Sequence, residues 1–525
     1  MLSFNYLAKN VNQLNANQSI LFVVSKEIDY KFIHQAFRTL NTINNKYVFS
    51  SSLDSLIDLH IDPLSDFEKS YLLKDNQIYT VEFTGDISNK REIKCVLKNE
   101  VLGNFDIVCF DGDTNYKTIQ IIETTKPKYL YGEVKFENFD YYEVWMRFSN
   151  FCEFILLSVT TKEYKNEIFE WTKGEYEVEL SIILPVYNVE KYLIDCFKAI
   201  ANWKVDFVEF LAVNDGSPDS SLAILEELAK QDSRIKIIDK PNGGCASARQ
   251  MGLENSKGRY VGFIDPDDFT TPDMFLQLHR RAMLGQHQVA YCGYNEFYET
   301  TKTHKPVLAD MLYEPYDKGT TDEKSIRKLI TDLRVGIWRG IYSRQFLIDE
   351  NINFNIEIKR FDDLPFKVEI FARAKSVVAI PEFMYFYRLQ RPGQDIAITD
   401  ERLYVHFQIF DYLDKKMDAG DREIMDLLQL VKIETHLWAI KKLEPKYKRK
   451  YIKLMKKDLR INAGFIRNML VSWRLRGSRR ALTYSAVYLG LTPVIKMLSI
   501  KENRIGTSKK SKYTVSKDKL RQFYE

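Results

Sequence analysis

The chain has 525 residues, of which 45% are hydrophobic and 28% are charged. This composition excludes a disordered chain, and the length allows roughly two to four globular domains. The six cysteines never occur at Cys-x-x-Cys spacing, so neither a zinc site nor a disulfide framework is indicated. The N-terminal residues lack the basic and apolar pattern of a signal peptide, and we therefore expect a cytoplasmic protein.

The net charge of +4 conceals an uneven distribution along the chain. Residues 441–525 contain 24 Lys and Arg against 5 Asp and Glu, a surplus of +19. The preceding 440 residues therefore carry a net charge of −15. A basic tail on an acidic body is typical of a protein that binds an anionic surface, either a membrane or a nucleic acid.

Residues 1–177 form the first of three predicted regions. Ser19–Val24 is an apolar run typical of a buried strand, and a helical pattern follows over residues 30–40. Further along, turn signals separate strand-like runs at Ile78–Phe83, Ile93–Leu97, Phe105–Phe110, Thr118–Ile122 and Phe154–Val159. We expect a small α/β piece followed by a β-rich piece. No role is indicated, because the one candidate metal motif, Asp111-Gly112-Asp113, is more typical of a β-turn.

The second region, 178–398, alternates strand and helix patterns. The strand runs are Leu180–Leu184, Phe207–Val213, Ile235–Ile238 and Tyr260–Ile264, and helical patterns cover Val189–Ala201, Pro218–Lys230 and Ala246–Asn255. Ser217 or Asp219 is expected to cap the second helix. The alternation predicts an α/β fold with a parallel sheet covered by helices. Since ligands bind such sheets beyond the carboxyl ends of the strands, the loops that follow the four strands are expected to form the site.

Three carboxylates directly follow the fourth strand, in Asp265-Pro266-Asp267-Asp268. Carboxylates this close repel one another unless a cation neutralises them. Mg²⁺ and Mn²⁺ bind carboxylate oxygens and leave coordination positions for substrate phosphates. The cluster therefore predicts a metal–diphosphate site, with a role at the N-terminus of a helix, which Pro272 and Asp273 open nearby, as the alternative.

Two further loops carry groups suited to a nucleotide. After the second strand, Asp215 can accept a hydrogen bond from a base N–H, and Gly216 allows the backbone to approach a ligand closely. After the third strand, the glycines of Asn242-Gly243-Gly244 free backbone N–H groups at the start of a helix, a natural place for phosphate or ribose. Arg249, about two turns into that helix, is placed to reach the diphosphate or the aspartates.

Four segments together resemble glycosyltransferase family 2: Ser181–Asn188 (SIILPVYN), Val213–Asp219 (VNDGSPD), Asn242–Arg249 (NGGCASAR) and Phe263–Asp268 (FIDPDD). The resemblance extends from Leu180 to Arg391. It implies a GT-A fold, which is a Rossmann-like nucleotide-sugar-binding domain. It also implies inverting transfer from a nucleotide sugar, usually a UDP-sugar, with Mn²⁺ or Mg²⁺.

The resemblance assigns roles to individual residues. Those expected at the nucleotide sugar are Pro185, Tyr187, Glu190, Asp215, Asn242, Gly243, Arg249 and Asp265. Within this set, Asp215 would hold the uracil, and Asp265 would face the ribose and the donor sugar. Asp267 would coordinate the metal. The chain departs from the family at Gln250, where Asn is usual, and this leaves the role of that position open.

The acceptor side of the site is expected further along the chain. An inverting transfer needs a general base that takes the proton of the acceptor hydroxyl. By resemblance Asp363 is the base, and Asp362 stands where the family has Glu; the alternative is that the pair caps the following helix. Arg388 or Arg391 would offset charge on the leaving diphosphate. Trp338 would either stack on a sugar face or serve as a core residue.

The third region, 399–525, is predicted to be helical and basic. Leu482–Ile495 is an apolar stretch that is interrupted by Pro493 and too short to span a bilayer. The basic residues before it are Arg474, Arg476, Arg479 and Arg480. An interfacial segment on an anionic membrane fits this pattern, and the alternative is a surface helix packed on the catalytic domain.

The resemblance implies a glycosyltransferase of capsule, lipopolysaccharide or teichoic-acid synthesis, and the basic tail predicts a location at the inner face of the cytoplasmic membrane. Its acceptor would be a saccharide or a lipid-linked molecule. A nucleotidyltransferase is the less suitable enzyme class, because Pro185–Asn188 is not the basic Gly-rich loop that such enzymes have. A nucleic-acid arm is disfavoured by the apolar segment within the basic tail. A non-catalytic nucleotide-sugar-binding or membrane scaffold is the remaining alternative, although the intact Asp215, Asp267 and Asp363 argue against it.

Overall fold

The computed structural model describes most of the chain between residues 18 and 491. The described residues are 18–24, 45–50, 56, 69–74, 77–84, 94–99, 102–110, 116–135, 141–160, 167–176, 178–200, 205–308, 316–391 and 397–491. The predicted helix over residues 30–40, the turn at 111–113 and the last part of the apolar stretch, 492–495, lie outside this set.

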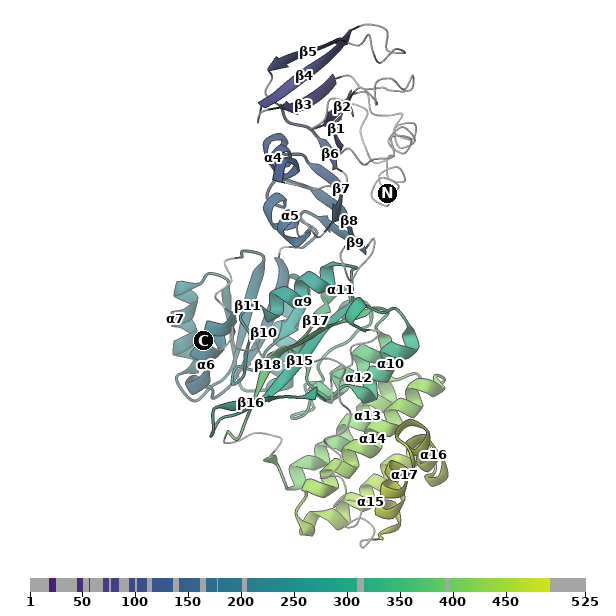
Figure 1. Cartoon of the computed structure of the whole chain (residues 1–525). Helices are drawn as coiled ribbons and strands as arrows, with labels where there is room; N and C mark the ends of the chain where they lie inside the picture. Colours follow the sequence, from purple (N-terminus) through teal and green to yellow (C-terminus); the bar gives the residue numbers. More distant parts are fainter. Residues whose placement is uncertain are drawn as a thin grey trace.

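The molecule is elongated, and two sheets and a helical region follow one another along its length (Figure 1). The N-terminal sheet lies at the upper end, and the central sheet, which carries the predicted loops, lies in the middle. The helices of residues 405–489 form the lower end.

The N-terminal sheet has nine strands in the order β5-β4-β3-β2-β1-β6-β7-β8-β9. They are β1 (Ser19–Val24), β2 (Asn45–Ser50), β3 (Lys69–Lys74), β4 (Gln77–Thr84), β5 (Lys94–Asn99), β6 (Ile107–Phe110), β7 (Tyr129–Lys135), β8 (Phe154–Thr160) and β9 (Glu167–Thr172). The stretch from β3 to β8 in sheet order is parallel, and antiparallel β4, β5 and β9 extend its edges. Numbered along the chain, the parallel strands have the order 3-2-1-4-5-6 of a doubly wound fold. The expected α/β piece and β-rich piece are thus parts of one sheet.

One predicted strand of this region is a helix. Residues 118–122 lie in α4 (Tyr116–Thr125), although their β-branched side chains favour a strand locally. The flanking strands β6 and β7 are parallel neighbours, and a parallel pair requires a crossover connection. The buried side chains of Thr118, Ile122 and Thr125 lie at helical spacing, so packing against the sheet overrides the local preference.

The central sheet has the strand order β12-β11-β10-β13-β17-β15-β18-β14, with β16 paired to β15. The strands are β10 (Val178–Val186), β11 (Val208–Asp215), β12 (Ile235–Lys240), β13 (Gly258–Phe263), β14 (Phe269–Thr270), β15 (Val289–Tyr298), β16 (Thr303–Pro306), β17 (Gly340–Ser343) and β18 (Val377–Leu389). The four predicted strands are confirmed as β10 to β13, which are parallel. The other strands add a mixed half that carries the acceptor-side segments.

The predicted helices of this region are confirmed as α6 (Glu190–Ile200), α7 (Ser221–Gln231) and α8 (Cys245–Asn255). Helix α7 starts later than expected, and Ser220 rather than Ser217 or Asp219 occupies its N-cap position. Asp219 nevertheless accepts a hydrogen bond from Ser221 N at 3.1 Å and another from Glu190 N at 2.9 Å. It therefore ties the start of α6 to the start of α7.

A buried polar cluster joins the N-terminal sheet to the central one. The hydroxyl of Tyr142, on α5 (Tyr141–Phe148), lies 2.8 Å from Nδ1 of His279, on α9 (Met274–Met283). Trp171 Nε1 donates a hydrogen bond to Glu179 Oε1 at 2.8 Å. Buried polar groups need such partners, so the contact fixes the N-terminal sheet against the central domain.

The third region is helical, as predicted. Its helices are η6 (Glu401–Tyr404), α13 (Val405–Lys416), α14 (Arg422–Lys442), α15 (Pro445–Asn462), α16 (Phe465–Arg476) and α17 (Ser478–Leu489). Helix α14 contacts each of α13, α15, α16 and α17 and is the centre of the group. Within the residues that the structure describes, no helix has both the length and the apolar character needed to cross a bilayer.

Candidate active site

The predicted loops meet at one edge of the central sheet. The parallel strands have the order β12-β11-β10-β13, so the chain turns to opposite sides of β10. In such sheets the ligand crevice lies at this switch point, between β10 and β13. Ile183 of β10 is paired with Phe263 of β13, so Pro185 and Asp265, each two residues further on, lie at the same edge. Asp215 ends the neighbouring strand β11 at this edge.

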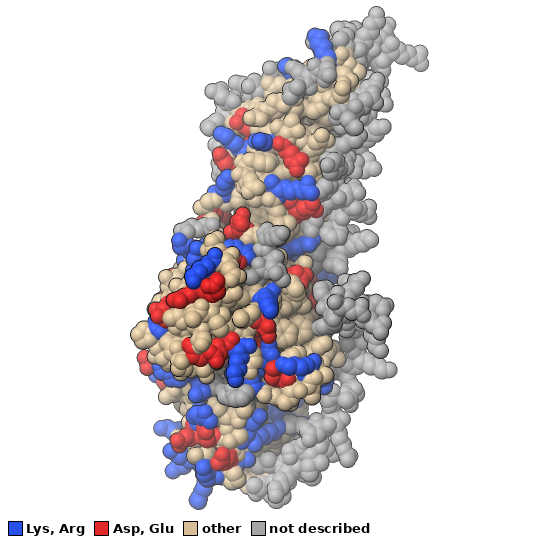
Figure 2. All heavy atoms as spheres, turned by 90° about the vertical axis from the view of Figure 1, so that its left-hand side faces the viewer, with Lys and Arg blue, Asp and Glu red and all other residues tan. Residues whose placement is uncertain are grey.

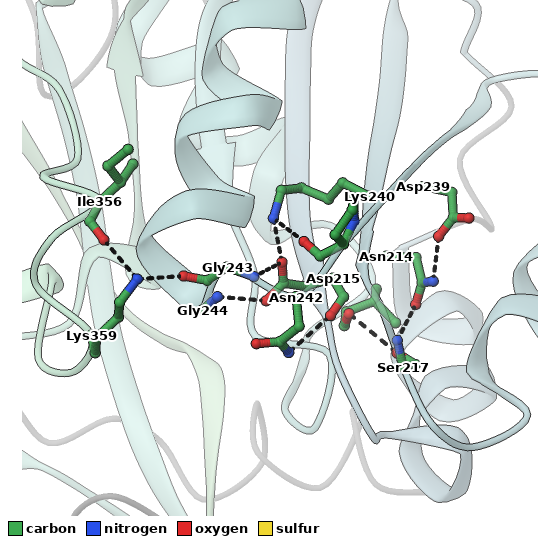
Figure 3. A network of polar contacts seen from close by, with 12 residues as sticks. Asn214, Asp215, Ser217, Asp239, Lys240, Asn242, Gly243, Gly244, Ile356 and Lys359 are labelled. Carbon is green, nitrogen blue, oxygen red and sulfur yellow. Dashed lines mark hydrogen bonds and ion pairs between the residues drawn. The ribbon is translucent and has the colours of Figure 1, made fainter.

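Asp215 organises the turn that precedes α8 (Figure 3). Its Oδ1 accepts hydrogen bonds from Lys240 Nζ at 2.5 Å and Gly243 N at 2.9 Å, and its Oδ2 accepts one from Gly244 N at 2.8 Å. A carboxylate has about four acceptor positions, so these three hydrogen bonds use most of them. Asp215 is almost fully buried. Its hydrogen bonds to Lys240, Gly243 and Gly244 hold the loops after β11 and β12 together.

The glycine loop after β12 is tightly packed. Asn242 Nδ2 donates a hydrogen bond to the main-chain oxygen of Asp215 at 3.0 Å. A Cβ atom on Gly243 would lie 2.6 Å from Ser247 Oγ, so the position accepts no side chain without rearrangement. Gly244 has a φ of +92° at the N-cap of α8, and no side chain caps the helix. The N–H groups of Gly243 and Gly244, expected from the sequence to be free for phosphate or ribose, are instead donated to the Asp215 carboxylate.

Lys359 belongs to the same group of residues, although no sequence motif marks it. Its exposed side chain crosses to the glycine loop, where Nζ donates hydrogen bonds to Gly243 O at 3.2 Å and Ile356 O at 3.3 Å (Figure 3). Main-chain oxygens do not neutralise an ammonium group, so Lys359 places a positive charge beside the glycine loop after β12. The only signal in the sequence is its position shortly before Asp362-Asp363.

Arg249 connects the donor side of the site to the acceptor side. Its Nη2 donates a hydrogen bond to Asp265 Oδ1 at 2.5 Å, and its Nη1 donates one to Asp362 Oδ2 at 2.7 Å. Arg249 and Asp362 are buried, and a buried guanidinium requires such partners. One side chain thus joins the loop after β13 to a segment 113 residues from Arg249.

Asp362 does not act as a helix cap through its side chain. It occupies the N-cap position of α12 (Asp363–Arg373), yet its side chain makes no capping hydrogen bond and is bound by Arg249. Burial and the charge of Asp362 raise the pKa of Asp363 to about 7, although Arg249 opposes this shift. A carboxyl group that titrates near neutrality is suited to take a proton from an acceptor hydroxyl.

Phe361, the residue before this pair, has an unfavourable backbone conformation. Its φ of +56° lies in the left-handed region, which costs an aromatic residue about 1–3 kcal/mol. Its ring packs on His406 and Trp438, with centroid distances of 5.2 Å and 6.1 Å. Helices α13 and α14 therefore hold the backbone that presents Asp363.

Asp268 and Arg388 form buried hydrogen bonds that support the loop after β13. Asp268 is buried and accepts hydrogen bonds from Tyr385 OH and from Arg388 N, both at 2.7 Å. The buried guanidinium of Arg388 donates to the main-chain oxygen of Asp267 at 2.6 Å and pairs with Glu299. Arg388, which the resemblance placed near the leaving diphosphate, thus has protein partners beneath the loop.

Asp267 is the carboxylate that fits a divalent cation. Burial raises its pKa, its ion pair with Arg391 opposes this, and the nearby Asp265 adds to it. A cation would favour the ionised form of such a group. Among the described residues, no group of three or more His, Cys, Asp or Glu side chains is arranged to hold a metal. Mg²⁺ commonly uses one or two carboxylates together with substrate phosphates, so Asp267 fits a cation that arrives with the donor.

Trp338 belongs to the core. It is only 5% exposed, and its ring stacks on those of Tyr385 and Tyr387 at centroid distances of 4.1 Å and 5.5 Å. Since these tyrosines cover the ring, the packing alternative fits the structure and stacking on a sugar does not.

The loop after β10 contains both an exposed side chain and a side chain that is hydrogen-bonded within the protein. Pro185 lies within the strand, and Tyr187 is exposed just beyond it. Glu190 Oε2 accepts a hydrogen bond from Ser220 N at 3.0 Å, which links α6 to the loop before α7. The loop therefore presents Tyr187 to solvent beside the crevice, while Glu190 supports its shape.

Known proteins are similar to the part of the chain that forms this site. Residues 181–341 match the family model described as glycosyl transferase family 2. The uncharacterized glycosyltransferase EpsJ of Bacillus subtilis is 32% identical over 234 residues, which cover 44% of this chain and 67% of EpsJ. The minor teichoic acid biosynthesis protein GgaB of Bacillus subtilis is 28% identical over 237 residues, 43% of this chain and 24% of GgaB. The S. aureus TarS 1-349 structure has a TM-score of 0.46 and 15% identity, covering 62% of this chain and 92% of that one.

The parallel sheet and its converging loops define a nucleotide-sugar-binding fold of the GT-A type, and the protein is a glycosyltransferase. By the family match and the similarity to EpsJ, the chain belongs to glycosyltransferase family 2. The family match ends at residue 341, so the N-terminal sheet, Asp362-Asp363 and the helical region lie outside it.

Proposed function

We propose that this enzyme transfers a sugar from a UDP-sugar to a saccharide or lipid-linked acceptor, with inversion at the anomeric carbon. The observation that carries the proposal is the Arg249 bridge, which joins Asp265 of the donor loops to Asp362 beside the candidate base. The resemblance assigns Asp215 to the uracil of the donor, and Asp215 ends β11 at the edge where the base would lie.

In the proposed reaction, Asp363 takes the proton of the acceptor hydroxyl. The acceptor oxygen forms a bond to the anomeric carbon while the bond to the diphosphate breaks, and the electron pair leaves with the diphosphate. Arg391 is better placed than Arg388 to offset that charge, because Arg391 pairs with the Asp267 carboxylate whereas Arg388 is buried below the loop. Mn²⁺ or Mg²⁺, held by Asp267 when bound, would neutralise further charge on the leaving group.

The proposed acceptor is part of a bacterial cell-surface polymer. Support comes from the similarity to GgaB, whose name refers to minor teichoic acid biosynthesis. Capsule and lipopolysaccharide are polymers of the same general kind. The surplus of positive charge in residues 441–525 supports work at the inner face of the cytoplasmic membrane, where lipid-linked acceptors are available.

A thermal-shift panel of UDP-, GDP- and dTDP-sugars on the full chain, with and without Mn²⁺, tests the donor. A ligand at about 100 times its Kd stabilises the folded state by about 2.7 kcal/mol, so a UDP-sugar should raise the midpoint clearly. Asp215→Ala should lose this response. Asp232→Ala, which removes a carboxylate bound locally to Arg234, should keep it. If no nucleotide sugar shifts the wild-type midpoint under either condition, the proposed function is wrong.

A further inference from the structure

The helical region exposes apolar side chains in ordered rows. On α16, Ile466, Leu470 and Trp473 are 67%, 50% and 59% exposed, and their spacing of four and three residues places them on one face. On α17, Leu482 and Leu489 are 59% and 60% exposed and lie two turns apart. We call these five residues the apolar stripe. Half of the large apolar side chains exposed in the described residues lie between residues 461 and 491, so the exposure is concentrated here.

The preceding helix, α15, has a basic face. Six exposed side chains recur at helical spacing and form what we call the basic stripe: Lys446, Arg449, Lys450, Lys453, Lys457 and Arg460. The single acidic residue of α15, Asp458, is buried and interacts with Lys432 and His436 instead. Lys446 pairs with Glu444 at the N-cap position, at 3.3 Å, and α15 itself carries no exposed acidic residue beside the other five members of the stripe.

The two stripes lie on one packed unit. Arg460 Nε donates a hydrogen bond to Tyr488 OH, on α17, at 2.8 Å, and Lys456 lies over the same ring, 5.1 Å from its centroid. Phe465 of α16 also packs on Tyr488, with 4.8 Å between the centroids. Figure 2 shows Lys and Arg gathered at the lower end of the molecule, where this unit lies. Positive charge and exposed apolar side chains are thus carried by neighbouring helices.

Two arginines that the sequence suggested for membrane contact have acidic partners within the chain. Arg474 pairs with Asp426 at 2.6 Å, and Arg476 pairs with Asp332 at 2.8 Å and Glu434 at 3.1 Å. These ion pairs fasten α16 to α14 and to the central domain. The charge that is available to an external partner therefore comes mainly from α15, one helix earlier than the sequence suggested.

We propose that the basic stripe and the apolar stripe together bind the surface of an anionic lipid bilayer. Lipid phosphates would neutralise the lysines, while Trp473 and the leucines would enter the boundary between headgroups and acyl chains. A second copy of the chain would bring a like-charged basic stripe. Residues 492–525 carry 9 Lys and Arg against 3 Asp and Glu and would also add positive charge. A nucleic acid would account for the lysines but not for the apolar stripe.

This inference assigns a surface to the membrane association proposed above and does not depend on the identity of the donor. Flotation of the full chain with vesicles of phosphatidylglycerol and phosphatidylcholine, compared with phosphatidylcholine alone, tests it. The wild type should float with the anionic vesicles, and added salt should weaken binding. Lys450→Glu/Lys453→Glu/Lys457→Glu should weaken it by about a hundredfold or more, since each lysine near the surface contributes about fivefold.

The double variant Leu470→Ser/Trp473→Ser should weaken binding by about tenfold or more. Because the lost contacts are apolar, the size of this loss should not depend on the salt concentration. Ile348→Ser is the matched control, because Ile348 is an exposed apolar side chain on α11 (Arg344–Asp349), outside the stripes. Each variant should retain the thermal shift with nucleotide sugar, which separates this test from failure of the proposed function.

Wild-type protein that stays out of the anionic vesicles would overturn the inference, and so would wild-type affinity in either stripe variant. Binding to duplex DNA without binding to vesicles would assign the basic stripe to nucleic acid and overturn it as well. A dimer that Leu470→Ser/Trp473→Ser abolishes, in a chain that ignores vesicles, would assign the apolar stripe to a second copy.

Discussion

The raised pKa of Asp363 has a consequence for stability that the Asp363→Asn variant exposes. An aspartate in an unfolded chain has a pKa of about 3.9, whereas the folded protein raises the pKa of Asp363 to about 7. Between these values the folded state binds a proton that the unfolded state has lost. Stability therefore falls with rising pH by about 1.4 kcal/mol per unit across this window. The loss is complete above pH 7, at about 4 kcal/mol.

Asparagine resembles the protonated acid and does not titrate. Asp363→Asn should therefore be about 2–4 kcal/mol more stable than the wild type near pH 8, the lower value allowing for partial exposure of the carboxyl group. The advantage should shrink as the pH falls toward 4. Turnover should fall by about 10²- to 10⁴-fold, because the general base is lost. Wild-type turnover itself should rise as the pH increases through 7, since a base works in its deprotonated form.

Urea unfolding at several pH values, together with UDP release, measures both effects. Asp362→Asn is the control: it removes a hydrogen-bonded partner of the buried Arg249 and should lower stability by about 1–3 kcal/mol. A stability difference between Asp363→Asn and the wild type that does not change with pH would refute the argument from burial. Turnover within about tenfold of the wild type would refute the assignment of the base.

Other variants probe the donor loops and the positioning of the base. Chelation of divalent cations should stop UDP release, and Asp267→Asn should raise the Mn²⁺ concentration required by about tenfold or more; turnover that ignores a chelator would contradict the metal assignment. Gly243→Ala should cost about 1–3 kcal/mol in urea unfolding, because its Cβ would meet Ser247 Oγ at 2.6 Å; unchanged stability would show that the loop yields. Phe361→Ala should lower kcat by about 10- to 100-fold with little change in the donor KM, because it releases the backbone that presents Asp363. An unchanged kcat in steady-state kinetics would argue against a role of Phe361 in positioning Asp363.

The strands and loops of the candidate donor half were predictable because their signals are local. Each of β10 to β13 is a short apolar run, each is followed within a few residues by its polar loop, and parallel strands bring such loops to one edge. The meeting of the loops that carry Asp215 and Asp267 at one edge of the sheet could therefore be expected before the structure was known. The same local reasoning failed for residues 118–122, where β-branched side chains favour a strand but the crossover between parallel β6 and β7 requires a helix.

The acceptor half depends on contacts between distant segments, and no local pattern encodes them. Arg249 and Asp362 are 113 residues apart, and only folding shows that one guanidinium serves both Asp362 and Asp265. Lys359 is unremarkable in sequence and becomes a donor-side charge because its chain crosses to Gly243. A lone Trp gives no means of choosing between stacking on a sugar and packing in a core.

The helical region packs directly beside the candidate base. Phe361 adopts a left-handed backbone conformation that would not persist without compensating contacts, and its ring packs on His406 and Trp438 of this region. Trp438 lies near the end of α14, only seven residues before Pro445, the first residue of α15. Trp438, which packs on Phe361 beside Asp363, is therefore close in the chain to the start of the basic stripe. If a bilayer binds that stripe, the helix it contacts packs on α14, which also packs beside Phe361, so membrane contact and the position of Asp363 would share one structural support.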